Sequence, residues 1–321
     1  MEPLVCVVTP VYNGEVFLQR CLQSVAEQTY ANWTHLIVDN ASTDGSAHIL
    51  AQASAAEPRI RVLRNKQTVD ALENHNIAIN SVPADAEYCK VLHADDELLP
   101  SCLEKMVSLA QQHPNVGIVG SYAEVNGKTV CKGLPEDRAW FEGSDAARRS
   151  LLGDAYPFWS PSCLLHRMSA LTKREHFYRA PHLHADVECA YELLRDWDLG
   201  FVPETLTRIA DHENSRTSRL AKPLKKLLAY NLDLFVRFGP EFIGPESYEG
   251  ALKQHLKRYY EALATGIFDL QGAEFWQYHR KAFEDCGLPF SSAAVLQAFG
   301  ERFFRSPIGS SRRITKALLH R

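Results

Sequence analysis

The stretch LVCVVTPVYNGEVFLQRCLQSVAEQTYANWTHLIVDNASTDGS, residues 4–46, decides the fold. It begins with a short apolar run, residues 4–9, that is rich in β-branched side chains and ends at a proline, as buried strands often do. Residues 15–28 then place apolar side chains at helical spacing. A second apolar run, residues 35–38, stops at Asp39. The stretch therefore predicts a strand, a helix and a second strand, which is the repeating unit of a parallel sheet.

The same alternation continues outward to about residue 125. The apolar strands show little alternation with polar residues, which fits burial on both faces of a sheet. We therefore expect an α/β fold with a mainly parallel, Rossmann-like sheet flanked by helices. The further strands are expected at residues 59–63, 88–92 and 116–125, and the further helices at residues 46–56, 69–82 and 100–112.

Beyond residue 125 the pattern is less regular and then becomes helical. We expect one α/β domain over residues 1–218, with halves 1–125 and 126–218, followed by a helical C-terminal region over residues 219–321. The second half is expected to hold a helix at residues 186–195 and short strands at residues 199–202 and 206–209. The helical region is expected to hold helices at residues 224–238, 248–269, 272–284 and 291–304.

Composition narrows the classes of partner and compartment. The chain has 321 residues and a formal charge of −4, so it has no global attraction to nucleic acid. None of its eight cysteines forms a CxxC pair, which argues against a zinc ribbon or a thioredoxin-type site. No apolar run reaches the roughly 18 residues of a membrane span, and no basic segment precedes the first strand. We therefore expect a cytoplasmic protein.

Polar clusters follow three of the predicted strands. They are residues 9–13, 39–42 and 93–96. Because ligands of open α/β sheets bind beyond the carboxyl ends of the strands, we expect these clusters to converge on one cleft.

Two of these clusters carry carboxylates with a plausible chemical use. Asp95 and Asp96 are adjacent and repel each other unless a cation or hydrogen-bond donors compensate. Mg²⁺ bound to one or two carboxylates and to phosphate oxygens is one solution; the alternative is an acidic helix N-terminus. Asp39 can accept a hydrogen bond from a nucleobase N–H, and the alternative is an ordinary strand-to-helix turn.

Four motifs in order resemble glycosyltransferase family 2. They are TPVYNG at residues 9–14, LQSVAEQTY at residues 22–30, IVDNASTDGS at residues 37–46 and VLHADD at residues 91–96. The resemblance covers roughly residues 4–218. It implies the GT-A fold and an inverting enzyme that transfers a sugar from a nucleotide sugar, most often a UDP-sugar, to a hydroxyl group. Residues 1–125 would then bind the donor, and residues 126–218 would hold the acceptor and the catalytic base.

The resemblance also implies roles for single residues. Asp39 would bind the base, and Asp95 would hold Mn²⁺ or Mg²⁺ against the diphosphate, where the ion acts as a Lewis acid. His212 matches a late family histidine that approaches the metal or the diphosphate, and a surface histidine is the alternative. The expected donor-binding residues are Thr9, Pro10, Tyr12, Glu15, Asp39, Asn40, His93, Ala94 and Asp95, with Asp95 and His212 at the metal.

On the acceptor side, Asp186 matches the position of the family's catalytic base. It would take the proton of the acceptor hydroxyl during attack on the anomeric carbon. The alternative is a helix cap, and Glu188 is the second candidate for the base. Phe158 and Trp159 lie where the family has an acceptor-facing loop, and aromatic faces stack on sugars, with core packing as the alternative.

Two departures from the family pattern keep other functions open. His93 replaces the first acid of the metal motif, and Glu73-Asn74 replaces a frequent Arg-Asn pair. A non-catalytic nucleotide-sugar-binding module is therefore one alternative. A nucleotidyltransferase is another, although the Gly-rich basic loop that it needs is missing after the first strand.

We expect the enzyme to act in the synthesis of a surface polysaccharide or a glycolipid. The acceptor would be a saccharide or a lipid-linked saccharide. The basic, amphipathic residues 302–321 favour peripheral contact with the inner membrane face, and packing of this segment on the protein is the alternative.

Overall fold

The structure is a computed structural model, and it describes residues 2–171, 177–179, 184–213, 215, 218–219 and 221–305. The chain divides into two compact units, Met1–His212 and Glu213–Arg321. Each unit has a hydrophobic core of its own.

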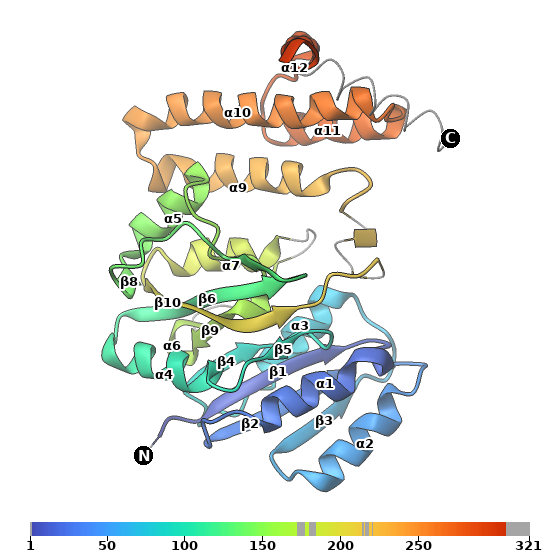
Figure 1. Cartoon of the computed structure of the whole chain (residues 1–321), viewed down its shortest axis with the longest axis vertical. Helices are drawn as coiled ribbons and strands as arrows, with labels where there is room; N and C mark the ends of the chain where they lie inside the picture. Colours follow the sequence, from blue (N-terminus) through green and yellow to red (C-terminus); the bar gives the residue numbers. More distant parts are fainter. Residues whose placement is uncertain are drawn as a thin grey trace. The chain divides into compact units, whose positions relative to one another are not determined.

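A single twisted sheet forms the centre of the first unit (Figure 1). Among the described residues it runs in the order β3-β2-β1-β4-β9-β6-β10-β5, with β7 paired to β6 and β8 to β10. The strands are β1 Val5–Val11, β2 Trp33–Asp39, β3 Ile60–Arg64, β4 Tyr88–Val91, β5 Glu97–Leu98, β6 Val116–Val125, β7 Lys128–Val130, β8 Trp140–Phe141, β9 Leu164–Arg167 and β10 Asp198–Ile209.

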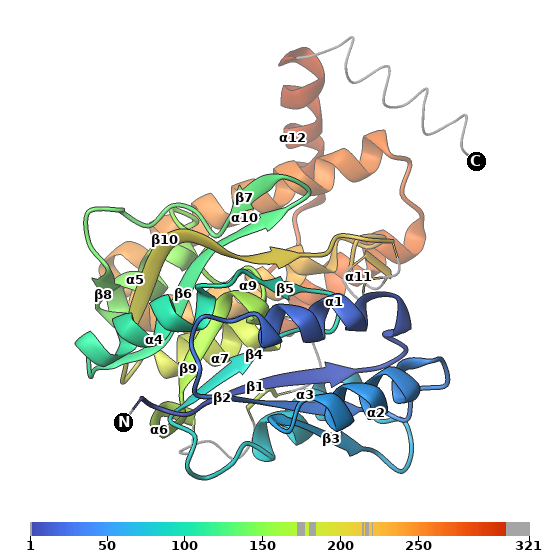
Figure 2. The ribbon, with the colours of Figure 1, turned by 60° about the horizontal axis from the view of Figure 1, so that its bottom comes forward.

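Helices cover both faces of this sheet. Leu18 of α1 and Leu50 of α2 pack with Val11 and Ile37 on one face, whereas α3 packs on β1 and β2 from the opposite side in Figure 2. The helices of this unit are α1 Glu15–Ala26, α2 Ser46–Ala56, α3 Ala71–Asn80, α4 Cys102–Gln112, α5 Gly143–Leu152, α6 Met168–Leu171 and α7 Ala185–Leu193, with the 3-10 turn η1 at Pro161–Cys163. The expected α/β fold, a sheet between helices, is confirmed.

The strand pairings that position the site are parallel. β1 lies between β2 and β4, and the pairing brings Val11 opposite Asp39 at the carboxyl ends of two neighbouring strands. β6 and β10 are also parallel. The sheet is not parallel throughout, because β9 runs antiparallel between β4 and β6.

Strand β10 differs from the expectation of two short strands. It is continuous over Asp198–Ile209, and within it, beyond an irregularity at its first residue, the pairing with β6 shifts register between Val202 and Thr205 and again before Thr207. Pro203 lies at the first shift and has no N–H to donate, which explains the interruption in the apolar pattern without a break in the strand.

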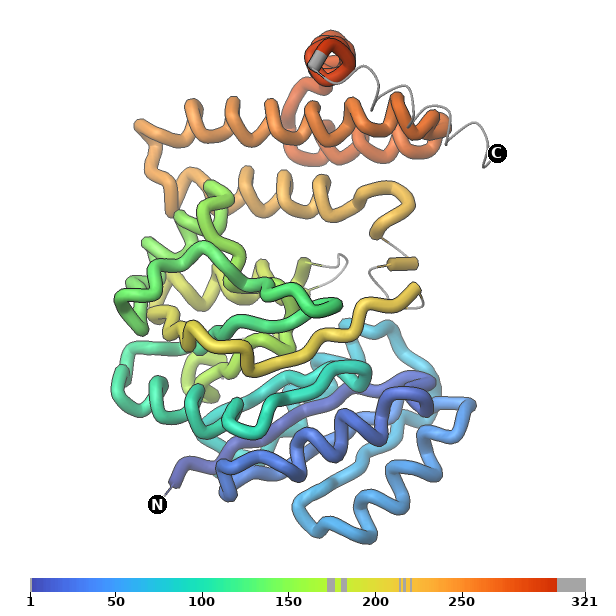
Figure 3. The backbone as a smooth tube through the Cα atoms, viewed as in Figure 1, coloured from blue at the N-terminus to red at the C-terminus, as the bar shows by residue number. Residues whose placement is uncertain are grey.

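The second unit is helical, as expected. Its helices are α9 Lys226–Phe242, α10 Pro245–Phe268, α11 Ala273–Asp285 and α12 Ser292–Arg305, the orange and red segments of Figure 3. Leu232, Leu263 and Phe283 lie in its core. In the same core, the hydroxyl of Tyr259 lies 2.6 Å from Nδ1 of His279. None of the described helices combines the length and the apolar character needed to cross a bilayer.

Candidate active site

The first two strand-to-helix loops are tied together at the carboxyl edge of the sheet. Asn13 and Ala41 both adopt left-handed backbone angles, with φ of 51° and 55°. The Asn13 N–H donates to Oγ of Ser42 at 3.0 Å, and the Thr43 N–H donates to Oδ1 of Asn13 at 2.9 Å. The two loops therefore form one structure, and the residues that they carry are held in fixed relative positions.

Glu15 makes a second tie between the same loops. Its carboxylate accepts the Gly45 N–H at 2.9 Å, and its own N–H donates to Asp44 at 3.0 Å. A carboxylate at the first residues of α2 is also favoured by the helix dipole. Glu15 thus lies at the expected edge, with its carboxylate engaged by the protein.

Asp39 forms a buried ion pair that the sequence did not indicate. Its side chain is 1% exposed, Oδ1 accepts the Ser42 N–H at 3.0 Å, and Oδ2 pairs with Nη1 of Arg64. Arg64 ends β3, is 47% exposed, and also donates from Nη2 to the Ser42 carbonyl at 2.8 Å. The neighbouring strand β3 therefore places a cation beside Asp39 at this edge of the sheet.

Several of the expected donor-binding side chains are engaged inside the protein. The Thr9 hydroxyl is buried and lies 2.8 Å from Nε2 of His35. The amide of Asn40 bonds both backbone groups of Val69, at 2.8 and 2.9 Å, so it holds the loop after β3. Tyr12, in contrast, is 54% exposed at the end of β1 and is available to a ligand.

An acidic cluster follows β4. One ligand atom from each of His93, Asp95 and Asp96 lies within 4.8 Å of the others, a cluster found among the described residues. Nδ1 of His93 is 3.7 Å from Asp96, and Nε2 of His212 is 3.0 Å from Asp95. The Ala210 N–H donates to Asp96 at 3.0 Å. The end of β10 thus meets the end of β4, and His212 lies at the cluster as expected.

The cluster fits a hard divalent cation. Burial raises the pKa of Asp96 to about 6, while the nearby His93 acts in the opposite direction. Oδ2 of Asp96 is buried and has no hydrogen-bond partner within the described part of the chain. Two carboxylates and imidazole nitrogens suit Mn²⁺, and the carboxylates alone suit Mg²⁺. Asp95, Asp96, His93 and His212 are the side chains that could hold the ion.

Asp186 lies in the first turn of α7. Its Oδ1 is buried without a hydrogen-bond partner among the residues that the structure describes, and burial raises its pKa to about 6. The nearby His93 acts in the opposite direction on the pKa of Asp186, as it does on the pKa of Asp96. Glu188, two residues further on in the same turn, is buried. A carboxyl group with a pKa near neutrality is suited to accept a proton.

Helix α3 contributes a histidine that sequence reasoning missed. The ring of His75 lies edge-on to His93 at 5.3 Å and 5.7 Å from Tyr178. Asn76 fixes the Tyr178 backbone through two hydrogen bonds of 2.8 Å. Glu73, which the sequence comparison singled out, is exposed. No motif marks His75, because its contacts are made across the fold.

The aromatic pair expected on the acceptor side divides between core and surface. Phe158 is 6% exposed and packs against Tyr191, whereas Trp159 is 54% exposed. The segment that follows them supports the acidic cluster: Oγ of Ser162 accepts the His93 N–H at 3.0 Å, and its carbonyl accepts from Nζ of Lys90 at 2.7 Å. Ala94 packs beside the core cluster beneath α1.

Comparison with known proteins identifies relatives of this arrangement. The family model described as "Glycosyl transferase family 2" matches residues 6–174. An uncharacterized glycosyltransferase of Haemophilus influenzae is 25% identical over 224 residues, which are 67% of this chain and 68% of that protein. The Escherichia coli UDP-Glc:alpha-D-GlcNAc-diphosphoundecaprenol beta-1,3-glucosyltransferase WfgD is 28% identical over 127 residues, 40% of this chain and 49% of WfgD. The chain thus matches about half of WfgD.

Solved structures share the fold. S. aureus TarS 1-349 in complex with UDP-GlcNAc superposes with a TM-score of 0.69 at 16% identity, covering 94% of this chain and 92% of that one. The mannosyltransferase PcManGT from Pyrobaculum calidifontis, in complex with GDP-Man and Mn²⁺, gives a TM-score of 0.58 at 16% identity, with 99% and 87% covered. The family match extends over more than half of the chain, from β1 through β9. The chain therefore belongs to glycosyltransferase family 2, and it is a glycosyltransferase with the GT-A fold.

Proposed function

We propose that the chain is an inverting glycosyltransferase that moves a sugar from a UDP-sugar to a hydroxyl group of a saccharide or lipid-linked saccharide. One observation supports this proposal most: Asp95 and Asp96 form a cluster with His93 within 4.8 Å, and the buried carboxyl of Asp186 is near enough to the same imidazole for His93 to act on its pKa. Family membership favours glycosyl transfer over the nucleotidyltransferase alternative.

The base-binding end would be formed by Asp39 and Arg64. The two oxygens of Asp39 are held by the Arg64 guanidinium and the Ser42 N–H, so a base N–H would use a remaining lone pair of this carboxylate, and Arg64 would offer its remaining N–H groups. Uracil presents one N–H flanked by carbonyls and matches this pair of groups, whereas guanine adds an amino donor beside its N–H and would need a further acceptor. The donors named for TarS and WfgD are UDP-sugars, which agrees with this preference.

The diphosphate would lie over the acidic cluster. When bound there, a divalent cation would neutralise charge on the leaving UDP as a Lewis acid. Asp95 and His212 would hold it, with His93 or Asp96 completing the set. The cation in the PcManGT complex is Mn²⁺.

Asp186 would act as the general base. Its carboxylate accepts the proton of the acceptor hydroxyl while that oxygen bonds to the anomeric carbon, and the bond from that carbon to the diphosphate breaks on the opposite face. The product would have inverted configuration. Trp159 would offer an exposed aromatic face to the acceptor.

The names of related proteins suggest the wider role. WfgD, by its name, glucosylates a sugar diphosphoundecaprenol. We infer a place in surface polysaccharide synthesis, with an acceptor carried by a membrane lipid. Peripheral contact of residues 302–321 with the inner membrane face would suit such an acceptor.

Two substitutions test the proposal. Asp186→Asn should lower acceptor-dependent UDP release by about 10²- to 10⁴-fold and leave Mn²⁺-dependent UDP binding, followed by calorimetry, nearly unchanged. Asp95→Ala should abolish the dependence of UDP binding on Mn²⁺. A fully active Asp186→Asn enzyme would remove Asp186 as the base, and an Asp95→Ala enzyme with normal metal dependence would remove the metal site.

A further inference from the structure

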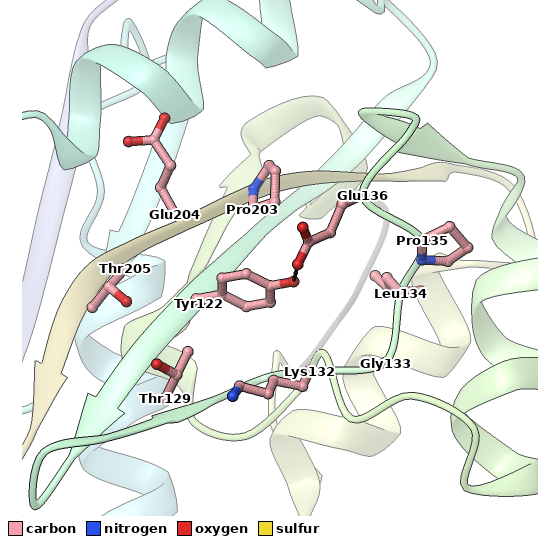
Figure 4. A pocket seen from close by; sticks show the side chains of 10 residues that line it. All are labelled: Tyr122, Thr129, Lys132, Gly133, Leu134, Pro135, Glu136, Pro203, Glu204 and Thr205. Atoms are coloured by element: carbon pink, nitrogen blue, oxygen red, sulfur yellow. Dashed lines mark hydrogen bonds between the residues drawn. The ribbon is translucent and has the colours of Figure 1, made fainter.

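The first unit carries a hollow that plays no part in the proposed reaction. It has a volume of about 590 Å³ and is walled by β6, β10 and the loop after β7. Figure 4 shows the Tyr122 side chain in its middle, with Thr129 and Lys132 on one side and Pro203, Glu204 and Thr205 on another. We call this hollow the Tyr122 groove.

The ring of Tyr122 is held in place on two sides. Its hydroxyl donates to Oε1 of Glu136 at 2.5 Å, and the ring meets Phe201 edge-on at a centroid distance of 5.2 Å. A ring fixed in this way can stack on a ligand without losing further freedom, since little side-chain entropy remains to be lost.

The loop that walls the groove is also fixed. Gly133 has φ of +109°, and a Cβ there would lie 2.3 Å from the Asp154 carbonyl oxygen, so only glycine fits so close to that backbone. Leu134 is buried, and the Lys132 carbonyl accepts the Tyr156 N–H at 2.9 Å. The groove is therefore formed before any ligand binds.

The chemistry of the lining suits a sugar. A pyranose ring presents C–H groups on its face and hydroxyl groups around its rim. The groove presents an aromatic face surrounded by the carboxylate of Glu136, the ammonium of Lys132 and the hydroxyls of Thr129 and Thr205. Ligand sites commonly combine such an apolar surface with a few polar groups that fix orientation. Glu204 is paired with Lys105, and the ammonium of Lys132 is balanced by the carboxylate of Glu136. The lining therefore has no excess of positive charge that would favour a polyanion.

Strand β10 connects the groove to the acidic cluster. Thr205 lies in the groove, and further along the same chain Ala210 bonds Asp96 and His212 bonds Asp95. At about 3.3 Å per residue of extended chain, the separation along this path is at most roughly 16 to 23 Å. A few sugar residues bridge such a distance.

We propose that the Tyr122 groove is a secondary saccharide subsite, which holds part of the acceptor several sugars away from the reacting hydroxyl. This inference rests on the proposed function for the identity of the acceptor. It predicts that long saccharides bind better than short ones, because only long ones reach both sites.

The test uses the full chain on an array of bacterial polysaccharide fragments two to eight sugars long, with calorimetry on the fragments that bind. We expect binding that strengthens with length and that Tyr122→Ala weakens by about tenfold. Glu136→Ala removes an exposed partner of the Tyr122 hydroxyl and should weaken binding in the same direction. Trp140→Ala, an exposed aromatic outside the groove, should leave binding unchanged.

Either of two results would overturn the subsite: no long fragment binds, or long fragments bind Tyr122→Ala and Glu136→Ala as well as the unaltered chain. Binding of UDP with Mn²⁺ is measured on the same samples. If the unaltered chain does not bind UDP, the proposed function is contradicted. Saccharide binding on the array tests the Tyr122 groove independently of that result.

Discussion

Asp186 shows how burial prepares a carboxyl group for base catalysis. Burial raises its pKa to about 6, so the ionised form becomes dominant only above that pH. If Asp186 is the base, the acceptor-dependent rate should fall about tenfold per unit as the pH drops below 6 and level off above it. The pH dependence of kcat/KM between pH 4.5 and 8 measures this. A rate that stays constant from pH 5 to 8 would assign the proton transfer to another group.

The same shift has a consequence for stability. Because the pKa of Asp186 in the folded protein lies above 3.8, the ordinary value of an aspartate, the protonated form is favoured on folding. The stability contributed in this way is complete below about pH 4 and is lost as the pH rises through 6. Asp186→Asn should therefore raise the free energy of unfolding at pH 8 by about 1 to 3 kcal/mol, since one pKa unit corresponds to about 1.4 kcal/mol.

The measurement is urea unfolding in EDTA at pH 5 and pH 8, for Asp186→Asn and the unaltered chain. The increase in the free energy of unfolding of Asp186→Asn over the unaltered chain should be smaller at pH 5 than at pH 8. If Asp186→Asn were less stable at both pH values, the carboxylate would have a stabilising partner and would not be a costly buried charge.

Arg64 is the residue at which donor selectivity should change. It pairs with one oxygen of Asp39, while the other oxygen accepts the Ser42 N–H, and the half-exposed guanidinium keeps N–H groups that could meet a base carbonyl. Arg64→Ala should weaken UDP binding by about tenfold, the effect of losing one or two charge-assisted hydrogen bonds. It should also narrow the preference for UDP over GDP. Calorimetry with both nucleotides and Mn²⁺ measures this, with Arg61→Ala, an exposed arginine of the same strand, as the control. Unchanged selectivity would exclude a role for Arg64 in reading the base.

At the scale of elements, the loops after β1 and β2 behave as one unit. Glu15 connects them through the Gly45 N–H at the start of α2. Glu15→Ala should lower the free energy of unfolding by about 1 kcal/mol. It should also weaken UDP binding, because the two loops would no longer be held in fixed relative positions. Glu15→Gln keeps an acceptor oxygen and should recover most of both. Thermal unfolding and calorimetry of the two variants provide the test. If Glu15→Ala and Glu15→Gln have the same stability and the same affinity for UDP, the carboxylate of Glu15 does not connect the two loops.

Elements with local signals were predictable. The helix over Ser46–Ala56 follows from the capping and turn residues just before it, and the strand over Val116–Val125 is closed by the turn residues Asn126-Gly127. Strand β9 was not predicted, because four residues between β4 and β6 become a strand only through pairing with both. The sequence predicted two short strands where β10 is one, because the apolar pattern is interrupted at Pro203. In the structure, pairing with partner strands keeps the chain extended through this interruption.

The candidate site was predictable to the same degree. The acids at strand ends were expected because a parallel sheet brings strand ends together, and His212 was expected because of the resemblance to glycosyltransferase family 2. Arg64 and His75 were missed, since each acts through a partner that is distant in sequence, Asp39 and His93. The amide of Asn40 was expected to bind the donor, but three hydrogen bonds to the loop after β3 engage it.

At the scale of the whole molecule, the proposed chemistry uses residues of the first unit alone. Every residue proposed to bind the donor, hold the metal or accept the proton falls within Met1–His212. The second unit has its own core of aromatic and aliphatic side chains, and no site residue was expected there. Because the proposed site residues all lie in the first unit, the C-terminal unit could serve to bring the enzyme to a lipid-carried acceptor.

The C-terminal sequence makes that role testable. Residues 306–321 lie outside the described residues, and their sequence holds Arg312, Arg313, Lys316 and Arg321 without an acidic residue. Each such cation near an anionic surface contributes about 1 kcal/mol, and salt screens the attraction. Removal of residues 306–321 should therefore weaken binding to phosphatidylglycerol vesicles by at least about tenfold at low salt. Binding to phosphatidylcholine vesicles should stay low for both chains.

Co-sedimentation with the two kinds of vesicle measures this binding. Thermal unfolding of the shortened chain distinguishes membrane contact by the segment from packing of the segment on the protein. Peripheral binding requires a loss of vesicle binding at an unchanged melting temperature, because cations that face the lipid contribute little to packing. A shortened chain that binds vesicles as before but melts earlier would assign the segment to packing on the protein, and a lipid-carried acceptor would then have to be reached through another surface.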